Sequence, residues 1–339
     1  MTTIREVAKQ AGVSISVVSK AFNNYTDIKE ETRQRIFAVA EELNYTPNIV
    51  AKSLSSKKQM TFGLITSGVL NHNEKDHNAF DVFKGVYLAV SESPYELSIF
   101  LIDSQSQKQK SYVQYCRERN IGGAILHGIR TDDPYYEELV KTDIPCVVLD
   151  IMPETINGLI GSVSINNVKA SKEMAGYLLK RNHRNIVVMA GTEETYVNSE
   201  RLKGTEQAFQ EHGAVLDKDK IFYAGFSEQQ AYRIAEKYLL DHRPSAFLCF
   251  SDLMAFGVIK AVQEKGLRIP EDISVTGFDD LVLSRYSRPP LTTISQNFME
   301  IGRVSAMLLQ DLKEGRAERQ HVYVEHQLLE RESVKVAFA

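Results

Sequence analysis

Cysteine is scarce and scattered in this sequence. Only Cys116, Cys146 and Cys249 occur among 339 residues, and each lies in an apolar run far from the others. A disulfide framework needs an even number of cysteines, and metal or redox motifs need closely spaced ones. We therefore expect three buried free thiols, which is typical of a protein from a reducing compartment.

Long apolar runs are also absent. The first twenty residues contain no apolar core of a signal peptide. No stretch approaches the roughly 20 apolar residues that a membrane-spanning helix needs. We therefore expect a soluble, cytoplasmic protein with no membrane partner.

The motifs of the common enzyme classes are missing as well. The chain has no Walker loop, no G-x-G-x-x-G after a strand, no G-x-S-x-G elbow and no C-x-x-C. We therefore expect neither a catalytic residue nor a cofactor. The polar segment 71–80 holds two histidines and two carboxylates, but their spacing fits no standard zinc motif. It is interpreted as a solvated loop over a pocket, not as a metal site.

What the chain does have is an uneven distribution of charge. The whole chain carries a net charge of −4. Residues 1–58 hold nine Lys and Arg against six Asp and Glu, a net of about +3, which leaves about −7 on the rest. A basic segment on an acidic body indicates a polyanionic partner at that end alone.

Residues 3–23 have the pattern of two short helices joined by a tight turn. Thr3 and Glu6 have the spacing of a capping box, and Gly12 can end the first helix with a positive φ. Ser14 can cap the second helix. Apolar residues at helical spacing form the two predicted buried faces: Ile4, Val7, Ala8 and Ala11, then Val17, Val18, Ala21 and Phe22.

The other side of the second helix presents Ile15, Ser16, Ser19 and Lys20. A reader of the DNA major groove exposes small, polar and basic residues in this way. On pattern alone, an ordinary helical hairpin within a core is an equally good interpretation.

A third helix over 30–44 is predicted to close a small core over the first two. Pro47 ends that stretch and can begin another helix, so residues 47–55 are predicted to form one short helix. A helix of that length is unstable alone and needs a partner surface. A polar, basic linker then reaches residue 60.

From residue 61 the hydrophobic period changes. Apolar runs of strand length alternate with amphipathic stretches, one of them predicted as a single helix over 107–119, which is the pattern of parallel βαβ units. Two sets of such units predict two lobes with a cleft at the carboxyl ends of the strands. The predicted strands are 62–66, 96–102, 123–127, 146–150 and 162–165, then 185–190, 220–224, 246–250 and 273–278.

The end of the chain departs from this alternation. A helix over 298–313 and a strand-like run over 321–329 are predicted to return across both lobes. The predicted division is 1–46 (helix-turn-helix headpiece), 47–60 (hinge helix and linker) and 61–339 (core), with about 61–161 and 293–322 in the first lobe and about 162–292 and 323–339 in the second.

Seven blocks of the sequence carry a resemblance to a known family. TIREVAKQAGVSISVVSKAFN and LNYTPNIVAKSL lie near the N-terminus, and SERLKGTEQAF, AFLCFSDLMAFG, ISVTGFDD, PPLTTISQ and LLERES follow in that order. They resemble the headpiece, hinge helix and core of the lactose/galactose-repressor (LacI/GalR) family of bacterial transcription regulators. The resemblance implies an all-α helix-turn-helix headpiece with a hinge helix, joined to a two-lobed α/β core like a periplasmic binding protein.

The resemblance also implies partners. It implies a homodimer that binds pseudo-palindromic double-stranded operator DNA, with headpieces in consecutive major grooves and hinge helices paired in the minor groove. A small-molecule effector in the core, here expected to be a mono- or oligosaccharide, would control operator affinity. The chain is thus predicted to repress carbohydrate-utilisation genes.

Positions that match the family make Ile15, Ser16 and Lys20 the base-reading set. Family members usually have Arg where Lys20 stands, so the preferred operator is expected to differ. The residues expected to hold phosphates, which position the protein without specifying sequence, are Ser14, Ser19 and Asn23.

In the hinge, Leu54 matches the leucine that the family inserts into a central base step. Such a wedge unstacks the step and bends the duplex. Packing on the partner's hinge is a simpler role for the same side chain and is compatible with it. Asn48 and Lys52 are expected to contact the DNA backbone.

In the core, Arg201 and Asp279 match the family's effector-holding pair. A guanidinium and a carboxylate can hold adjacent sugar hydroxyls in fixed directions. A purely structural ion pair between them is the alternative. Asp150 and Ser67, each at the carboxyl end of a strand in the first lobe, are further effector candidates.

Three more residues complete the candidate effector site. Ser251 stands where related proteins often place an asparagine that contacts ligand, which leaves room for a larger effector. Gln296 lies in the crossover between the lobes, where closure of the cleft could be sensed. Phe80 could stack on a sugar face, although a scattered aromatic residue more often belongs to a core.

Other functions remain to be distinguished. A nucleobase corepressor or a phosphorylated partner protein could replace the sugar, but a flat nucleobase would need aromatic stacking on both faces. A transport solute-binding protein would share the two-lobed core, yet it would need an export signal and would have no use for residues 1–58. The sequence does not identify the effector, its direction of action or the operator.

Overall fold

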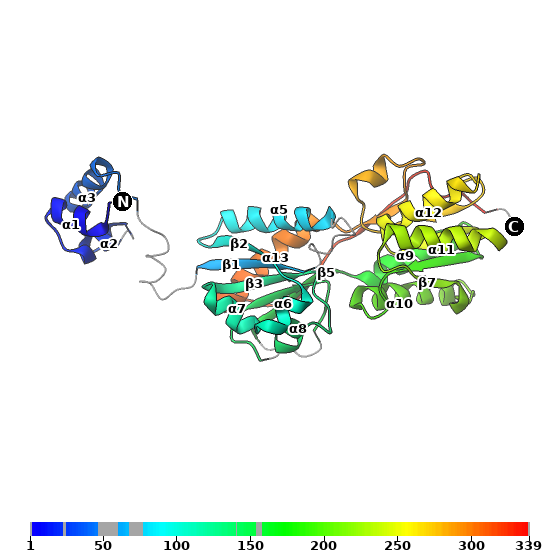
Figure 1. Ribbon diagram of the computed structural model, residues 1–339, viewed down its shortest axis with the longest axis horizontal. Helices are drawn as coiled ribbons and strands as arrows, with labels where there is room; N and C mark the ends of the chain where they lie inside the picture. The colour runs from blue at the N-terminus through cyan, green and yellow to red at the C-terminus, as the bar shows by residue number, and fades with distance from the viewer. Residues whose placement is uncertain are drawn as a thin grey trace. The chain divides into compact units, whose positions relative to one another are not determined.

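The computed structural model describes residues 2–22, 25–46, 60–67, 77–139, 141–153 and 158–337. The chain divides into two compact units, 1–60 and 61–339, whose elements are labelled in Figure 1. The predicted hinge helix over 47–55 and residues 71–76 of the polar loop lie outside the described residues. No helix in the described ranges is long and apolar enough to cross a bilayer.

The first unit contains three helices, α1 (Ile4–Ala11), α2 (Ile15–Phe22) and α3 (Glu30–Glu42). Their apolar faces meet in one small core, as the sequence predicted. Its buried members are Val7, Ala8, Ala11, Val18, Ala21, Ile36 and Ala40, with Ile4, Val13, Val17, Phe22, Val39, Leu43 and Tyr45 packed around them.

The turn between α1 and α2 has the predicted signals. Glu6 accepts a hydrogen bond of 2.7 Å from the backbone N–H of Thr3. Gly12 ends α1 with a φ of 67°. The hydroxyl of Ser14 accepts a hydrogen bond of 3.3 Å from the backbone N–H of Val17 and so caps α2. The Thr3–Glu6 contact caps the start of α1, whereas Gly12 and Ser14 form the turn between the two helices.

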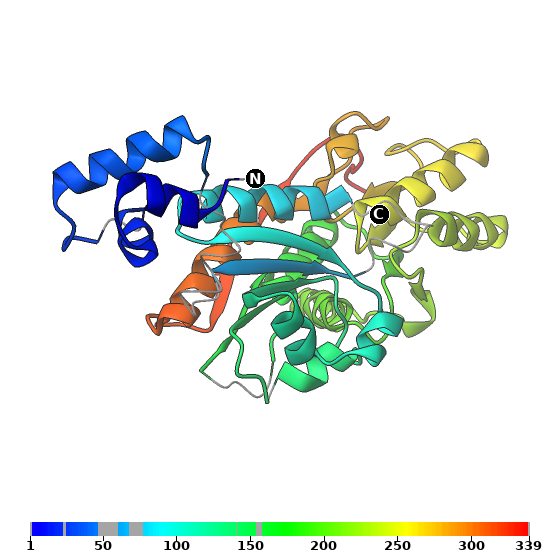
Figure 2. The ribbon, with the colours of Figure 1, turned by 60° about the vertical axis from the view of Figure 1, so that its left-hand side comes forward.

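The first lobe of the second unit is built on a six-stranded, fully parallel sheet of order β11-β5-β4-β3-β1-β2. Helices α5 (His77–Ser91) and α13 (Phe298–Glu314) cover one face, and the shorter helices α6 (Ser104–Gln109), α7 (Tyr112–Glu118) and α8 (Pro134–Leu139) cover the other (Figures 1 and 2). The strands are β1 (Thr61–Thr66), β2 (Glu96–Leu101), β3 (Ile121–His127), β4 (Cys146–Leu149), β5 (Ile160–Ile165) and β11 (His321–Val324).

The second lobe has a four-stranded parallel sheet of order β7-β6-β8-β9. Its helices pack in two pairs, α9 (Asn167–Lys180) with α10 (Tyr196–Glu211) and α11 (Glu228–Asp241) with α12 (Asp252–Glu264). The strands are β6 (Ile186–Ala190), β7 (Ile221–Tyr223), β8 (Ala246–Cys249) and β9 (Ser274–Thr276).

The crossover between the lobes differs from the prediction. Strand β5 pairs with β4 and β11 and so belongs to the first lobe, whereas the sequence placed 162–165 in the second. Strand β10 (Thr293–Ser295) pairs with β12 (Gln327–Leu329), and a bridge between Asp279 and Ser295 joins β10 to the second lobe. The lobe of a strand is fixed by its pairing partner, which the local pattern does not reveal.

The single helix predicted over 107–119 is two helices, α6 (Ser104–Gln109) and α7 (Tyr112–Glu118). The hydroxyl of Ser111 accepts a hydrogen bond of 3.1 Å from the backbone N–H of Gln114 and caps a new helix start. Lys110, just before it, has an extended backbone. A serine that can cap a helix is a stronger local signal for a new helix start than the continued apolar spacing is for one unbroken helix.

Glycines allow two of the helix pairs to pack backbone against backbone. A Cβ on Gly85 of α5 would lie 1.9 Å from the carbonyl oxygen of Met299 in α13. A Cβ on Gly204 of α10 would lie 2.1 Å from the carbonyl oxygen of Val168 in α9. These crossings bring each helix pair closer than any side chain would permit.

The three cysteines are free and buried, as predicted. Burial raises the pKa of the Cys116 thiol to about 12 and also raises the pKa values of the Cys146 and Cys249 thiols. The three therefore stay as neutral thiols at physiological pH.

Candidate functional site

The predicted DNA-reading side of α2 lies outside the headpiece core. Ser14, Ile15 and Ser16 are exposed, with 43% of Ile15 accessible, and Ser19 and Lys20 are half-buried. The hydroxyls of Ser14 and Ser16 lie 2.8 Å apart. An apolar residue left exposed beside two hydroxyls suits contact with a thymine methyl group and with hydrogen-bonding base edges.

Lys20 has an acidic neighbour that the sequence interpretation missed. Its ammonium forms an ion pair with the carboxylate of Asp27, in the turn between α2 and α3. The pair raises the pKa of Lys20 and lowers that of Asp27. The basic member of the predicted base-reading set is thus already bound to a carboxylate.

Four more residues were predicted to contact DNA. Asn23 follows α2 directly, and Asn48, Lys52 and Leu54 belong to the predicted hinge; all four lie outside the described residues. Their roles stay predictions from the sequence.

Arg201 is the centre of the candidate effector site in the core. It lies on α10 and is 4% exposed. Its Nε donates a hydrogen bond of 2.9 Å to the side-chain oxygen of Asn167, and its Nη1 donates one of 2.5 Å to the carbonyl of Phe250. Its guanidinium carbon lies 3.7 Å from the ring centroid of Phe278. The guanidinium is therefore held over an aromatic ring, with its Nε and Nη1 already hydrogen-bonded.

The charges of carboxylates from both lobes act on this guanidinium. Burial lowers the pKa of Arg201, and the charges of Asp279, Asp150 and Asp252 act in the opposite direction. Within the described part of the chain, no direct ion pair joins Arg201 to Asp279. Arg201 thus lies within the electrostatic influence of Asp150 and Asp279, without a direct ion pair to Asp279 among the described residues.

Asp279 is the most perturbed member of the cluster. Burial raises its pKa to about 8, against the lowering effect of Arg201. Its carboxylate accepts a hydrogen bond of 2.6 Å from Nε2 of Gln296, and its backbone φ is 123°. At neutral pH the carboxyl is therefore largely protonated and can donate as well as accept a hydrogen bond.

Two amides near this cluster have unused hydrogen-bonding atoms. Oε1 of Gln296 and Nδ2 of Asn198 are buried and have no hydrogen-bond partner among the described residues. The other amide atom of Asn198 accepts a hydrogen bond of 2.8 Å from the backbone N–H of Gly191, at the end of β6. Buried polar atoms are rarely left unpaired, so an acceptor and a donor here call for partners.

Asp150, Ser67 and Phe80, also predicted to bind the effector, each have contacts of their own within the first lobe. Asp150 ends β4 with a φ of 59°, and its carboxylate accepts a hydrogen bond of 2.7 Å from Ser164. Ser67 is buried just after β1, and its backbone N–H donates to the carbonyl of His127. Phe80 is 68% exposed on α5, beside the ring of Phe83.

Ser251 has a structural role that the sequence did not predict. Its hydroxyl accepts a hydrogen bond of 3.2 Å from the backbone N–H of Met254 and caps α12. A ligand contact through this hydroxyl would have to share it with the cap.

Asp252, which follows Ser251, was also missed by the sequence interpretation. Its fully buried carboxylate accepts hydrogen bonds of 2.6 Å from Thr293, 2.6 Å from Ser284 and 2.8 Å from the backbone N–H of Leu281. It thereby joins α12 to the crossover strand β10. The only local signal was its position in the first turn of a helix.

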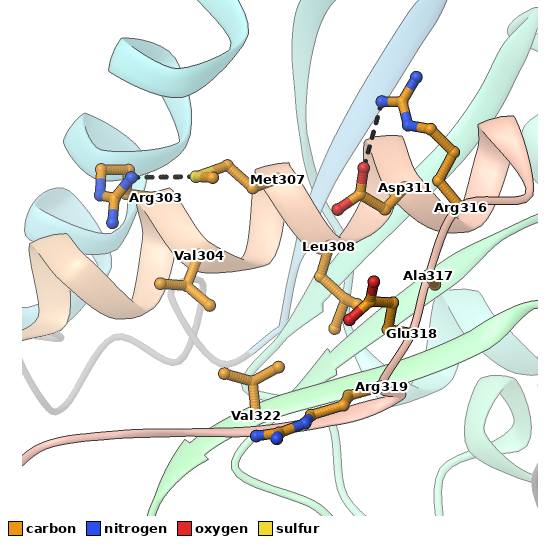
Figure 3. A pocket seen from close by; sticks show the side chains of 10 residues that line it. All are labelled: Arg303, Val304, Met307, Leu308, Asp311, Arg316, Ala317, Glu318, Arg319 and Val322. Carbon is orange, nitrogen blue, oxygen red and sulfur yellow. Dashed lines mark hydrogen bonds and ion pairs between the residues drawn. The ribbon is translucent and has the colours of Figure 1, made fainter.

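A separate pocket of about 540 Å³ lies between α13 and β11 (Figure 3). Arg303 donates a hydrogen bond of 2.9 Å to the sulfur of Met307, and Arg316 pairs with Asp311 at 3.2 Å. None of the predicted effector residues lines this pocket.

Two family models match the chain. Residues 3–48 match the model described as bacterial regulatory proteins, lacI family, and residues 175–334 match a periplasmic binding protein-like domain. A probable HTH-type transcriptional repressor ExuR of Bacillus subtilis is 33% identical over 340 residues, which cover 99% of each chain. The HTH-type transcriptional repressor PurR of Photobacterium profundum is 30% identical over 345 residues, again 99% of each.

Solved structures resemble the whole chain. A lac repressor dimer bound to operator and the anti-inducer ONPF has a TM-score of 0.87 and 25% identity, and covers 98% of this chain and 99% of its own. A complex of the transcriptional regulator CelR with cellobiose has a TM-score of 0.73 and 26% identity, and covers 98% of this chain and 100% of its own.

Proposed function

Because the chain belongs to the lacI family of bacterial regulatory proteins and is a DNA-binding transcriptional repressor, not an enzyme, we propose that a small sugar bound between its lobes controls its operator affinity. The genes under its control would be carbohydrate-utilisation genes. A repressor of this kind acts where the bacterial chromosome lies, in the cytoplasm.

One observation carries this proposal. Asp150 of the first lobe and Asp279 of the second both act on the buried guanidinium of Arg201. The vicinal hydroxyls of a sugar both donate and accept hydrogen bonds, so one ring can bridge a guanidinium and carboxyl groups in fixed directions. The unpaired Oε1 of Gln296 offers a further acceptor for a hydroxyl.

A nucleobase corepressor is the main alternative. A flat base is held best between aromatic faces, and one face of Phe278 is already covered by the guanidinium of Arg201. The polar character of the cluster therefore favours a polyol. The complex of the similar regulator CelR with cellobiose also supports a carbohydrate.

The active form is proposed to be a homodimer. Large apolar side chains are exposed on α5 (Tyr87, Leu88) and on the edge strand β2 (Ile99, Leu101) of the first lobe. A second set is exposed around residues 282–286 of the second lobe. Exposed apolar patches of this kind mark interaction surfaces, and a lac repressor dimer is a similar solved structure.

We propose that the sugar acts by changing the angle between the lobes. Such a change would alter the separation of the two predicted hinge segments in the dimer. A short helix is stable only against a partner, so a small separation would unfold it and withdraw the proposed Leu54 wedge from the DNA. Operator affinity would then fall.

The test is release of operator DNA. An operator selected from a randomised duplex pool is bound to the full chain, and a panel of mono- and oligosaccharides is then added while fluorescence anisotropy is recorded. Release by one sugar, with calorimetric binding to the protein alone, supports the proposal. A response to a purine panel alone would establish the nucleobase alternative, and no response to either panel would favour a phosphorylated partner protein.

A further inference from the structure

The ion pair between Lys20 and Asp27 joins the predicted base-reading helix to the turn that follows it. The side chains of Lys20 and Asp27 keep 44% and 55% of their surface accessible to solvent. Exposed ion pairs contribute little to folding stability because water and salt screen them. The pair therefore matters mainly for where the ammonium of Lys20 lies.

The backbone holds Asp27 close to the end of α2. The N–H of Tyr25 donates a hydrogen bond of 3.1 Å to the carbonyl of Lys20. Arg33 of α3 donates hydrogen bonds of 3.3 Å to the carbonyl of Ala21 and 2.8 Å to that of Tyr25. The turn is thus tied to α2 and to α3 two residues before Asp27, so the carboxylate is placed in advance of DNA binding.

An ammonium held in this way keeps donors for a base. Lysine has three N–H donors, and the pair with Asp27 uses one of them. Two remain for the O6 and N7 acceptors of a guanine in the major groove. A lysine without such a partner is a flexible point charge. Nearby phosphates then compete with a base edge for its ammonium.

The carboxylate also acts on the DNA itself. A negative charge beside the phosphates opposes non-specific binding, which depends almost entirely on electrostatic attraction to the backbone. In the operator complex the hydrogen bonds from Lys20 to guanine would offset this repulsion. A duplex without that guanine would offer no such compensation.

We propose that Asp27 is a positioning residue for Lys20, which directs the ammonium to a base edge and raises the ratio of operator to non-specific affinity. The inference rests on the proposed base-reading role of Lys20. It assigns to the turn between α2 and α3 a part in sequence discrimination.

The experiment compares four full-length chains: wild type, Lys20→Ala, Asp27→Asn and Glu41→Gln. Glu41 is an exposed carboxylate near the end of α3, so its replacement removes the same charge from the same unit without touching Lys20. Base preferences are read by selection from a randomised duplex pool. Affinity for a scrambled duplex is measured by fluorescence anisotropy across a series of KCl concentrations.

Lys20→Ala identifies the base pair that Lys20 reads, because the preference for one base should fall at that position. Loss of a specific base contact usually lowers the discrimination between bases about 5- to 150-fold. At that pair, Asp27→Asn is expected to lower the preference at least about threefold. It should also tighten binding to the scrambled duplex and steepen the salt dependence by about 0.9 for each headpiece. Glu41→Gln should leave the base preference unchanged, and Asp27→Glu should restore part of it.

The possible failures are distinguishable. If Lys20→Ala leaves every base preference unchanged, the base-reading role of Lys20 is wrong and the inference falls with it. If Lys20→Ala alters one position but Asp27→Asn behaves like Glu41→Gln there, the positioning role is overturned while the base-reading role stands. Circular dichroism on each variant shows whether the headpiece remains folded, and a folded Asp27→Asn protein with wild-type preferences also overturns the proposal.

Discussion

Nε2 of Gln296 donates a hydrogen bond of 2.6 Å to Oδ1 of Asp279. Gln296 lies between β10 and α13, where the chain passes from the second lobe to the first. Asp279 follows β9, and the charge of Arg201 lowers its pKa against the larger effect of burial. This bond therefore connects the proposed effector site to one of the segments that cross between the lobes.

The raised pKa of Asp279 predicts how stability changes with pH. Burial raises this pKa to about 8, whereas an aspartate in an unfolded chain titrates near about 3.9. Between these two pH values the folded state therefore binds more protons than the unfolded state. The contribution of Asp279 to the free energy of unfolding is greatest below about pH 4 and is lost as the pH rises through about 8. Burial raises the pKa of Asp252 too and adds to the same trend.

We expect Asp279→Asn to flatten the fall in melting temperature between about pH 5 and about pH 8. Scanning calorimetry of wild type and variant across that range checks it. An unchanged slope in the variant would show that Asp279 does not carry the titration.

The buried carboxylate of Asp252 predicts a large loss of stability on truncation. Asp252→Ala leaves the hydroxyls of Ser284 and Thr293 and one backbone N–H without their acceptor, so we expect a loss of roughly 3 kcal/mol or more. Urea unfolding measures the loss. The matched control is Asp143→Ala, which breaks an exposed ion pair with Arg117 and should cost less than about 1 kcal/mol.

The close crossing of α5 and α13 predicts that Gly85 tolerates no side chain. Gly85→Ala would place a Cβ 1.9 Å from the carbonyl oxygen of Met299, so the helices must move apart. We expect a destabilisation of roughly 1–3 kcal/mol in urea unfolding. Gly158→Ala is the control, because a Cβ there meets nothing within 4 Å. Equal midpoints for the two variants would refute this account of the packing.

Leu54 lies outside the described residues, so its role is tested on the sequence prediction alone. Replacement by serine removes the apolar wedge that would enter the base stack. We expect Leu54→Ser to bind sugar and dimerise as the wild type does, but to lose about tenfold or more in operator affinity. Gel-shift titration against selected and scrambled duplexes measures this. Retained tight operator binding would eliminate the wedge.

Local signals in the sequence predicted most of the fold. The helix predicted over 298–313 is α13 (Phe298–Glu314) in the structure, and the Gly12 turn and the Ser14 cap are as expected. Caps, turns and apolar period act over a few residues, so a single sequence displays them. The split of 107–119 at Ser111 was missed because the apolar period was weighted above a cap signal.

Contacts between distant parts of the chain could not be predicted. The pairing of β5 with β11 and the stacking of Arg201 on Phe278 each depend on three-dimensional proximity. The ion pair of Lys20 with Asp27 joins residues close in sequence, but it depends on the course of the turn between them. The resemblance to a family identified Arg201 and Asp279, but Asn167, which holds the guanidinium, carried no motif of its own. The sequence thus indicated the main site residues and not the groups that orient them.

The central claim is that a sugar held by Arg201, in the second unit, controls the operator affinity of the headpiece. The most direct measurement compares operator release by the effective sugar for wild type and Arg201→Ala, with folding checked by circular dichroism. The account predicts that the variant binds operator within about threefold of wild type but needs at least about tenfold more sugar for release. Release of the folded variant at the wild-type sugar concentration would contradict it.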